Sequence, residues 1–565
     1  MKPHAALRAA ALAAALLLPG PAKAAAQDLE PPPVPWGRVP PPGPYAAGFD
    51  ALHYRVAVEI PDTGAYIRGT TTIDIRLSAP RDTLVLDLTG LRVNAVHAGT
   101  SATLSPAAFR QTDGRLRVAV PAGARAGDTL HVRVEYEGTP DDGLLIRPNL
   151  HGARSVFADN FPDRGRFWFP SIDHPGDKAT VEYEVRVPAS WEVVANGRRA
   201  GADSDAARPA DGVWRWRMEA PIPTYTMVIG AADFAVGTVA RCARGGPTPI
   251  RPDGCVHVSY WAYPQDSAKA ATAFARAGDM IEYYAGRFGP YPYHKLAHVQ
   301  SSTRFGGMEN AGAIFYSERA INAGRLGEVT VAHETAHQWF GDAVTESMWN
   351  DAWLSEGFAT YFGMQYFERA ESVAHFRELL AGSARGYLES QVTHLAMVDT
   401  LRVPDDNLMS LLNANSYNKG GQLLHMLRGV LGDDAFFRGI AAYYRRHVNG
   451  NARTVDLRQA LEETSGRSLD WFFEQWAYRP GYPIYRVTHS WDAVASEVEV
   501  RVEQVQDADW PAFRMPVEFA FETPAGELRR TAEVAGRLAR IRFALPAAPA
   551  AVRLDPDGWI LKEVR

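Results

Sequence analysis

The chain has 565 residues, of which 46% are hydrophobic and 22% are charged, and its formal net charge at pH 7 is -6. These fractions are typical of a soluble globular protein with full hydrophobic cores, and the length predicts about three or four domains. The slight negative charge, without a block of basic residues, argues against nucleic acid and anionic membranes as partners.

The first 26 residues are typical of a targeting segment. Lys2 and Arg8 give a positive start, residues 9–18 form a short apolar run, and either 22–24 or 24–26 offers a cleavage site with small residues at its ends. The run is too short to span a bilayer, and no cysteine follows it that would carry a lipid anchor. We therefore expect a signal peptide at 1–26 and an exported protein without a membrane anchor, periplasmic or secreted in a bacterium.

The next segment, 27–48, is rich in proline and predicts an extended linker. From about residue 49 onward, hydrophobic residues alternate with polar ones, as in 52–60, and Gly, Asp and Pro separate such runs. This pattern predicts an N-terminal antiparallel β domain over 49–245.

The chain has two cysteines, Cys242 and Cys255, on either side of a loop rich in Gly and Pro. In an exported protein a close, even pair favours one intrachain disulfide. Two free or buried thiols are the alternative, and a metal site is not indicated because no second pair exists.

The strongest chemical signal lies in the stretch 329–361, which contains an H-E-x-x-H sequence at 333–337. On a helix, His333 and His337 project from one face one turn apart, so both rings can reach a single Zn²⁺. Glu334 can then take a proton from the water that such a metal activates. The alternative is a pair of ordinary polar histidines on an amphipathic helix.

A third ligand is offered by Glu356, a carboxylate within the otherwise apolar run 353–359. An unpaired acid in such a run would be costly, and catalytic zinc usually has three protein ligands and one open position. A hairpin of two helices would bring Glu356 beside His333 and His337. We therefore predict one Zn²⁺ per chain, held by these three residues.

Three further segments accompany this predicted site. Residues 306–310 read G-G-M-E-N, residues 416–420 read S-Y-N-K-G, and residues 472–483 contain F-F-E-Q-W and P-G-Y-P. In the stretch 333–356, H-E-x-x-H is followed after eighteen residues by Glu. This spacing, together with the three segments, resembles the M1 metallopeptidases, the aminopeptidase N and leukotriene A4 hydrolase group. The resemblance covers most of the mature chain. It implies a zinc aminopeptidase with a thermolysin-like, mainly helical catalytic domain, expected at 246–484.

The G-G-M-E-N segment is expected to bind substrate. A carboxylate at Glu309 would bind the protonated α-amine of a peptide, and that contact would make a peptidase an exopeptidase. The glycines, Gly306 and Gly307, let the backbone approach a ligand closely. Met308 and Asn310 belong to the same predicted substrate-binding segment.

Tyr417 completes the expected catalytic set, with Glu334 as the general base. A phenol near the zinc can donate a hydrogen bond to the oxyanion that forms at the scissile carbonyl. The alternative is an ordinary tyrosine on an amphipathic helix.

The N-terminal domain departs from the family pattern. Residues 169–175 resemble its P-x-x-D-x-P segment, but Phe161 stands where the family usually has a Gln or Glu that helps to bind the amine. Asp159 or Asn160 could substitute, so the assignment among these, or none, stays open. Ser355 stands where the family more often has Asn, before the third ligand.

From about 485 the alternating pattern returns, which predicts a small C-terminal β-sandwich at 485–565 and no C-terminal helical array. The expected fold is thus multidomain α+β.

Two other functions stay open: an epoxide hydrolase-like side activity, and a non-catalytic binding protein on the same fold. The latter would be expected to lose Glu334, Glu309 or Tyr417, and all three are present. The preferred first residue, the physiological substrate and the oligomeric state are not predicted.

Overall fold

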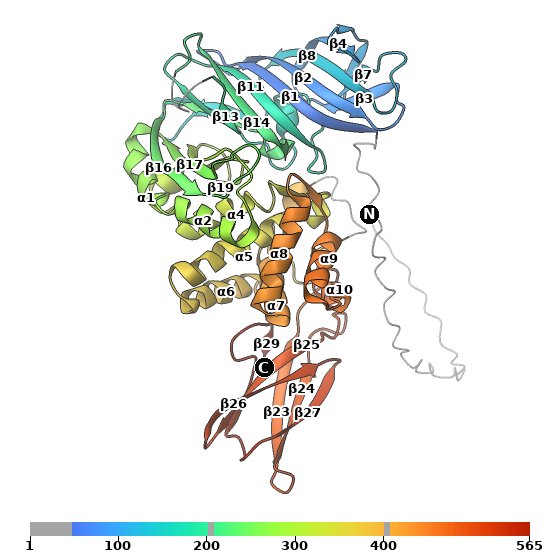
Figure 1. The fold of residues 1–565 in the computed structure, drawn as a ribbon, viewed down its shortest axis with the longest axis vertical. Helices are drawn as coiled ribbons and strands as arrows, with labels where there is room; N and C mark the ends of the chain where they lie inside the picture. Colours follow the sequence, from blue (N-terminus) through green and yellow to red (C-terminus); the bar gives the residue numbers. More distant parts are fainter. Residues whose placement is uncertain (1–47, 202–207, 400–406) are drawn as a thin grey trace, which may run out of the picture. The chain divides into compact units, whose positions relative to one another are not determined.

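A computed structural model describes residues 48–201, 208–399 and 407–565 (Figure 1). The predicted signal peptide and all of the predicted linker but its last residue lie outside the described residues. In the part of the chain that is described, no helix is both long enough and apolar enough to cross a membrane.

The N-terminal part is rich in β structure, because its strands place apolar side chains on every second residue; in β2 the buried positions alternate from Ile67 to Leu77. The largest sheet has eight strands in the order β13-β14-β11-β1-β2-β8-β4-β5 (Figure 1). Its strands are β1 (Phe49–Glu59), β2 (Ile67–Leu77), β4 (Arg92–Gly99), β5 (Ser105–Pro106), β8 (Thr129–Gly138), β11 (Lys178–Arg186), β13 (Arg198–Arg199) and β14 (Val213–Pro223). The prediction of a purely antiparallel domain is wrong in one respect. β1 and β11 pair in parallel. More than a hundred residues separate these two strands along the chain, so no short hairpin turn forces them to run antiparallel.

Two smaller sheets complete this part, in the orders β3-β7-β6 and β12-β15-β10-β9. Their strands are β3 (Thr83–Asp87), β6 (Phe109–Thr112), β7 (Arg115–Ala119), β9 (Leu144–Pro148), β10 (Arg154–Ala158), β12 (Glu192–Ala195) and β15 (Ile229–Ala232).

A five-stranded sheet, in the order β16-β17-β18-β20-β19, follows along the chain. Its strands are β16 (Ala235–Arg244), β17 (Cys255–Ala262), β18 (Lys295–Ser301), β19 (Gly307–Met308) and β20 (Ala313–Ser317). The domain boundary at 245 stays a prediction, although β16 pairs with β17 across it.

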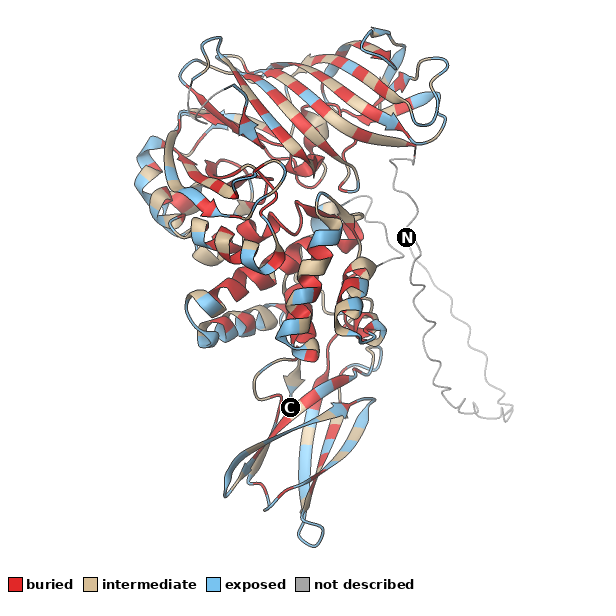
Figure 2. Ribbon diagram, in the orientation of Figure 1, coloured by how far each residue is buried: buried red, intermediate tan, exposed pale blue. Residues whose placement is uncertain are grey.

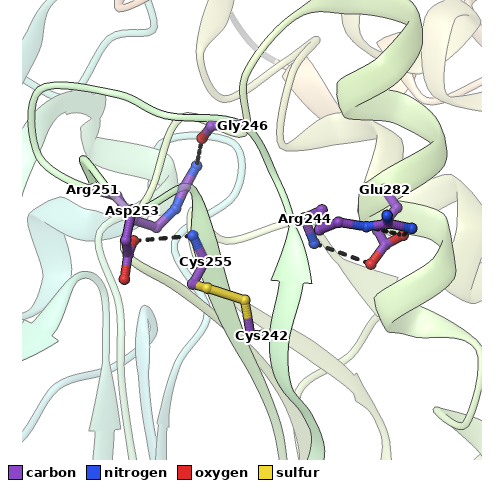
Figure 3. The surroundings of a disulfide bond; sticks show 7 residues. All are labelled: Cys242, Arg244, Gly246, Arg251, Asp253, Cys255 and Glu282. Carbon is purple, nitrogen blue, oxygen red and sulfur yellow. Dashed lines mark hydrogen bonds and ion pairs between the residues drawn. A yellow bond between two sulfur atoms is a disulfide. The ribbon is translucent and has the colours of Figure 1, made fainter.

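The predicted disulfide is confirmed, since Cys242 and Cys255 are bonded across the hairpin of β16 and β17 (Figure 3). Within the hairpin loop, the Arg251 guanidinium donates to the carbonyl of Gly246 (Figure 3). Arg244 pairs with Glu282 on helix α2 (Ala277–Phe288), which anchors the hairpin to the helical part.

Helices dominate from residue 267 to 476. The α-helices are α1 (Ser267–Ala273), α2 (Ala277–Phe288), α3 (Glu318–Asn322), α4 (Glu328–His337), α5 (Trp353–Ala370), α6 (Val373–Leu388), α7 (Gly420–Leu431), α8 (Asp433–His447), α9 (Thr454–Ser465) and α10 (Asp470–Trp476). Short 3-10 helices lie at Gly165–Phe167, Thr224–Thr226, Pro264–Asp266, Trp349–Asp351 and Leu408–Leu411. A π-helix spans Asn415–Lys419, and strands β21 (Val344–Glu346) and β22 (Gly450–Ala452) form a two-stranded sheet.

Helix α5 is at the centre of this part and is buried on nearly every side (Figure 2). A helix that is apolar all round belongs in a core, which agrees with its run of Trp, Leu, Phe, Tyr and Met residues.

Side chains of the N-terminal β-rich part donate hydrogen bonds to the backbone of the turn that follows helix α4. The ammonium group of Lys178 on β11 is buried and donates to the carbonyls of Asp342, Ala343 and Gly450 at 2.8, 2.9 and 3.1 Å. The hydroxyl of Tyr225 donates to the carbonyl of Gly341 at 3.1 Å. These contacts fix the backbone that leads from α4 towards α5.

Residues 485–565, all of which are described, contain strands and no helix. They form two sheets, in the orders β27-β24-β23-β29 and β26-β25-β28. The strands are β23 (Ile484–Asp492), β24 (Glu497–Gln504), β25 (Met515–Thr523), β26 (Gly526–Val534), β27 (Leu538–Ala544), β28 (Ala551–Leu554) and β29 (Glu563–Val564). Trp559 stacks on His425 of α7 with ring centres 4.6 Å apart.

Candidate active site

Helices α4 and α5 bring together the two histidines and the glutamate of the predicted site. His333 and His337 lie one turn apart on α4, and their Nε2 atoms are 3.0 Å from each other. Glu356 lies in the first turn of α5, with Oε2 at 3.4 Å from Nε2 of His333 and 3.3 Å from Nε2 of His337. Three atoms that could ligate a metal therefore converge from two helices.

Hydrogen bonds at the far side of His337 determine how its ring faces this cluster. Its Nδ1 lies 3.1 Å from the carbonyl oxygen of Phe340, which can only accept. We infer that Nδ1 carries the proton and that Nε2 offers a lone pair to the cluster. The hydroxyl of Ser355 lies 3.1 Å from the same Nδ1, so the departure from Asn at this position keeps a polar group beside His337.

The cluster fits a metal cation. Oε2 of Glu356 is buried and accepts no hydrogen bond from any described residue. The ligand atoms of His333, His337 and Glu356 all lie within 4.8 Å of one another. Two imidazole nitrogens and one carboxylate oxygen are the ligands that zinc takes in catalytic sites, and a cation would satisfy acceptors that no protein donor reaches.

The electrostatics of the pocket also favour cations. Glu309, Glu334 and Glu356 line one cavity, and no Lys or Arg is among its described lining residues. Burial raises the pKa of Glu309 to about 7 and raises that of Glu334 well above its usual range. Burial acts on Glu356 in the same direction, but the facing rings of His337 and His333 bring the pKa of that carboxyl below its usual value.

Strand β19 passes directly over the predicted base, as expected for the G-G-M-E-N segment. A Cβ atom at Gly307 would collide with the carboxylate of Glu334, so glycine is required here if the predicted base is to keep its place. A Cβ atom at Gly306 would meet nothing within 4 Å, so Gly306 is not required for the same reason.

Tyr417 reaches the cluster from the π-helix Asn415–Lys419. Its hydroxyl donates to Oε1 of Glu356 at 2.8 Å, and its ring stacks on His333 with centres 6.0 Å apart. Burial raises the pKa of the phenol well above its usual value, which keeps it a hydrogen-bond donor. The widened turn of a π-helix often occurs at functional sites.

The cavity at this cluster has a volume of about 220 Å³. It contains every predicted site residue except Asn310, and it adds three apolar residues that the sequence did not identify as site residues. The lining residues are Phe161, Phe305, Gly306, Gly307, Met308, Glu309, His333, Glu334, His337, Glu356, Leu412 and Tyr417. The side chain of Asn310 is buried outside the lining and has no hydrogen-bond partner among the described residues.

The structure also bears on the open question of Asp159 and Asn160. Asp159 pairs with Arg164 at 2.9 Å and with Arg304 at 2.8 Å. The side chain of Asn160 donates to two backbone carbonyls and accepts from Trp168. Both polar side chains are occupied outside the cavity, and Phe161 is the residue of this segment that lines it.

Comparisons with known proteins agree with this geometry. Residues 50–226 match the family model described as the peptidase M1 N-terminal domain, and residues 272–476 match the peptidase family M1 domain. Aminopeptidase N of Streptomyces lividans is 28% identical over 465 residues, which are 78% of this chain and 51% of that protein. Leucyl aminopeptidase of Saccharolobus solfataricus is 26% identical over 443 residues, which are 75% of this chain and 53% of that protein.

A solved structure is also similar, that of an M1 zinc metallopeptidase from Deinococcus radiodurans. It is 27% identical in sequence with a TM-score of 0.64, and the match covers 77% of this chain and 95% of that chain. The chain spans about half the length of the curated relatives it matches. The two family models nevertheless cover both its β-rich N-terminal part and its helical part, and the chain belongs to the peptidase M1 family.

Proposed function

We propose that this protein is a zinc-dependent aminopeptidase that removes the first residue from peptides with a free N-terminus. The observation that carries the proposal is one cavity in which two imidazoles and three buried carboxylates converge. The names of the relatives, aminopeptidase N and leucyl aminopeptidase, support the same activity.

His333, His337 and Glu356 would hold one Zn²⁺ per chain, through two ring nitrogens and a carboxylate oxygen. Zinc in such a site supplies a Lewis acid that polarises a carbonyl group and lowers the pKa of water. Ser355 and the carbonyl of Phe340 orient His337 for this role through its Nδ1.

Glu334 acts as the general base. Its carboxylate takes a proton from the attacking water and later gives that proton to the nitrogen that leaves. Burial raises the pKa of Glu334, and a raised pKa makes a carboxylate a better proton acceptor near neutral pH.

Glu309 and Tyr417 act on the substrate itself. Glu309 binds the protonated α-amine, because in the cavity it is the one carboxylate not assigned to the metal or to proton transfer. The hydroxyl of Tyr417 donates to Glu356 in the free protein. It would exchange this partner for the oxyanion that forms at the scissile carbonyl.

The test of this assignment compares L-leucine 4-nitroanilide with its N-acetylated form. We expect cleavage of the free-amine substrate alone, sensitive to a metal chelator, because acetylation removes the charge that Glu309 binds. The variant Glu309→Gln should raise KM for the free amine. Equal cleavage of both substrates by the unmodified protein would contradict an aminopeptidase.

Several finer expectations belong to this proposal. We infer that residues 1–26 direct export, to the periplasm or beyond, where the disulfide between Cys242 and Cys255 would form. We also infer that the two C-terminal sheets pack as a β-sandwich. The ring centre of Phe543 on β27 lies 5.4 and 5.0 Å from the ring centres of Phe519 and Phe521 on β25, which belongs to the other sheet. A non-catalytic role is not favoured, because Glu334, Glu309 and Tyr417 all line the cavity.

A further inference from the structure

We propose that the cavity selects peptides whose first residue has a large apolar side chain, and that Phe161 and Phe305 determine this selectivity. The inference rests on the proposed aminopeptidase function and adds the class of substrate to it.

The lining of the cavity is divided by chemistry. All of its charged or ionisable groups belong to the proposed catalytic and amine-binding set: His333, His337, Glu309, Glu334, Glu356 and Tyr417. The remaining side chains are all apolar: Phe161, Phe305, Met308 and Leu412. No residue of the described lining is left to pair with a charged side chain of the substrate.

The aromatic wall is built as a rigid cluster. The ring of Phe161 packs edge-on against Phe305, Tyr225 and Trp349, with ring centres 6.0, 5.5 and 5.4 Å apart. Tyr225 is itself fixed by its hydrogen bond to the carbonyl of Gly341. A ring held on several sides keeps its place when a ligand binds, so the wall is preorganised for an apolar group.

Polar neighbours of this wall are not available to the substrate. Asp159, two residues before Phe161, is buried and held by Arg164 and Arg304. The guanidinium of Arg164 lies 5.8 Å from the ring centre of Phe305, and its charge is matched by Asp159. This ion-pair network supports the wall without contributing to the cavity lining.

The aromatic wall adjoins the proposed amine anchor. Met308, also in the apolar lining, directly precedes Glu309 along the chain. Glu309 lines the same cavity as the rings of Phe161 and Phe305. Because the α-amine and the side chain of a first residue share one Cα atom, an amine at Glu309 directs that side chain towards this wall.

Physical chemistry then predicts the order of substrates. Burial of a Leu, Met or Phe side chain is favourable by about 1.5–3 kcal/mol relative to exposure. A buried charge without a partner is strongly unfavourable. First residues that are large and apolar should be preferred over alanine, and alanine over glutamate and lysine.

The experiment measures kcat/KM of the zinc-loaded full chain for 4-nitroanilides of Leu, Met, Phe, Ala, Glu and Lys. We expect the first three to exceed Ala by about tenfold or more, and Glu and Lys to fall below Ala. Values for Glu or Lys that equal the value for Leu would overturn the selectivity while leaving the aminopeptidase function intact. Cleavage of none of the six substrates would overturn both proposals.

Two variants and a matched control assign the selectivity to the wall. Phe305 is only partly buried, so Phe305→Ala should fold, and Phe161→Leu keeps an apolar side chain at a buried position. We expect Phe305→Ala to lower kcat/KM for Leu about tenfold more than for Ala, mainly through KM, and Phe161→Leu to lower the ratio of Phe to Ala. Phe109→Ala, at a 40% exposed position on β6, should leave both ratios unchanged.

A second series varies the next residue, with Leu-Ala, Leu-Glu and Glu-Ala amides as substrates. We expect the rate to depend on the first residue far more than on the second. A rate that depends only on the second residue, or unchanged ratios in both variants, would contradict the assignment of Phe161 and Phe305.

Discussion

Two regions of the molecule bury a carboxylate beside histidine, and they differ in what the protein supplies around it. Asp266, directly before α1, is fully buried and is surrounded by donors. Its oxygens accept from His151 at 2.7 Å, Gln300 at 2.8 Å, Asn322 at 2.8 Å and Lys269 at 3.3 Å. Burial would raise the pKa of Asp266, but these hydrogen bonds bring it to about 2.

The cavity at α4 and α5 is the opposite case. Oε2 of Glu356 faces two ring nitrogens and accepts no hydrogen bond from any residue that the structure describes, and burial raises the pKa values of Glu309 and Glu334. A carboxylate whose oxygens all meet donors holds a fold together, whereas an acceptor that faces only other acceptors fits a cation from outside the chain. The contrast predicts that changes in the cavity affect activity, and that changes at Asp266 affect stability.

The largest effect is expected from Glu334→Gln. Removing the base should lower kcat by about 10²–10⁴-fold, while zinc content and the free energy of unfolding stay close to those of the unmodified protein. Steady-state kinetics with metal analysis checks both halves. Wild-type turnover by this variant would show that Glu334 is not the base.

The next effect is expected from Tyr417→Phe. Loss of the hydroxyl that donates to the oxyanion should lower kcat by about 10²-fold with little change in KM. The ring that stacks on His333 stays in place, so the thermal midpoint should change little. A rise in KM at unchanged kcat would instead assign Tyr417 to substrate binding.

For Asp266→Asn we expect a loss of stability rather than of activity. The amide cannot accept all the hydrogen bonds that the carboxylate accepts, so the free energy of unfolding should fall by about 1–3 kcal/mol. Activity per folded molecule should not change. Asp233→Asn, at an exposed position, serves as the control in denaturant unfolding. Equal free energies of unfolding for Asp266→Asn and Asp233→Asn would show that the hydrogen bonds of Asp266 do not stabilise the fold.

The smallest effect is expected from Glu346→Gln, on the strand β21 after α4. Burial raises the pKa of Glu346 from 4.5 to about 8, so between these values the native state holds a proton that the unfolded state has released. Stability from this residue is therefore present at low pH and is lost as pH rises through about 8. The variant should be more stable than wild type at pH 9, and the difference should shrink at pH 5. Parallel pH profiles of unfolding would contradict this.

The sequence predicted those parts of the site that depend on local spacing. His333 and His337 share a helix face by the period of the helix alone, and Glu356 lies near the start of the next long helix. The close approach of Gly307 to Glu334 agrees with the glycine-rich segment expected near the cleft. The disulfide was predicted from the number and spacing of the cysteines and from the expected export of the protein.

The remaining features depend on long-range packing. Phe161, Phe305 and Leu412 come from three distant segments, and an aromatic pocket wall has the same sequence pattern as an ordinary core. His151 and Asp266 are 115 positions apart, so nothing local indicates their contact. The π-helix that carries Tyr417 lies in a part of the chain that was predicted only as mainly helical.

The account depends most directly on one metal ion held by two helices. Metal analysis of the purified mature chain should give about one zinc per molecule, retained in Glu334→Gln and lost in Glu356→Ala, while Asp266→Asn keeps its zinc. A folded wild-type chain that binds no divalent cation, or a Glu356→Ala chain that binds zinc as tightly as wild type, would contradict the account.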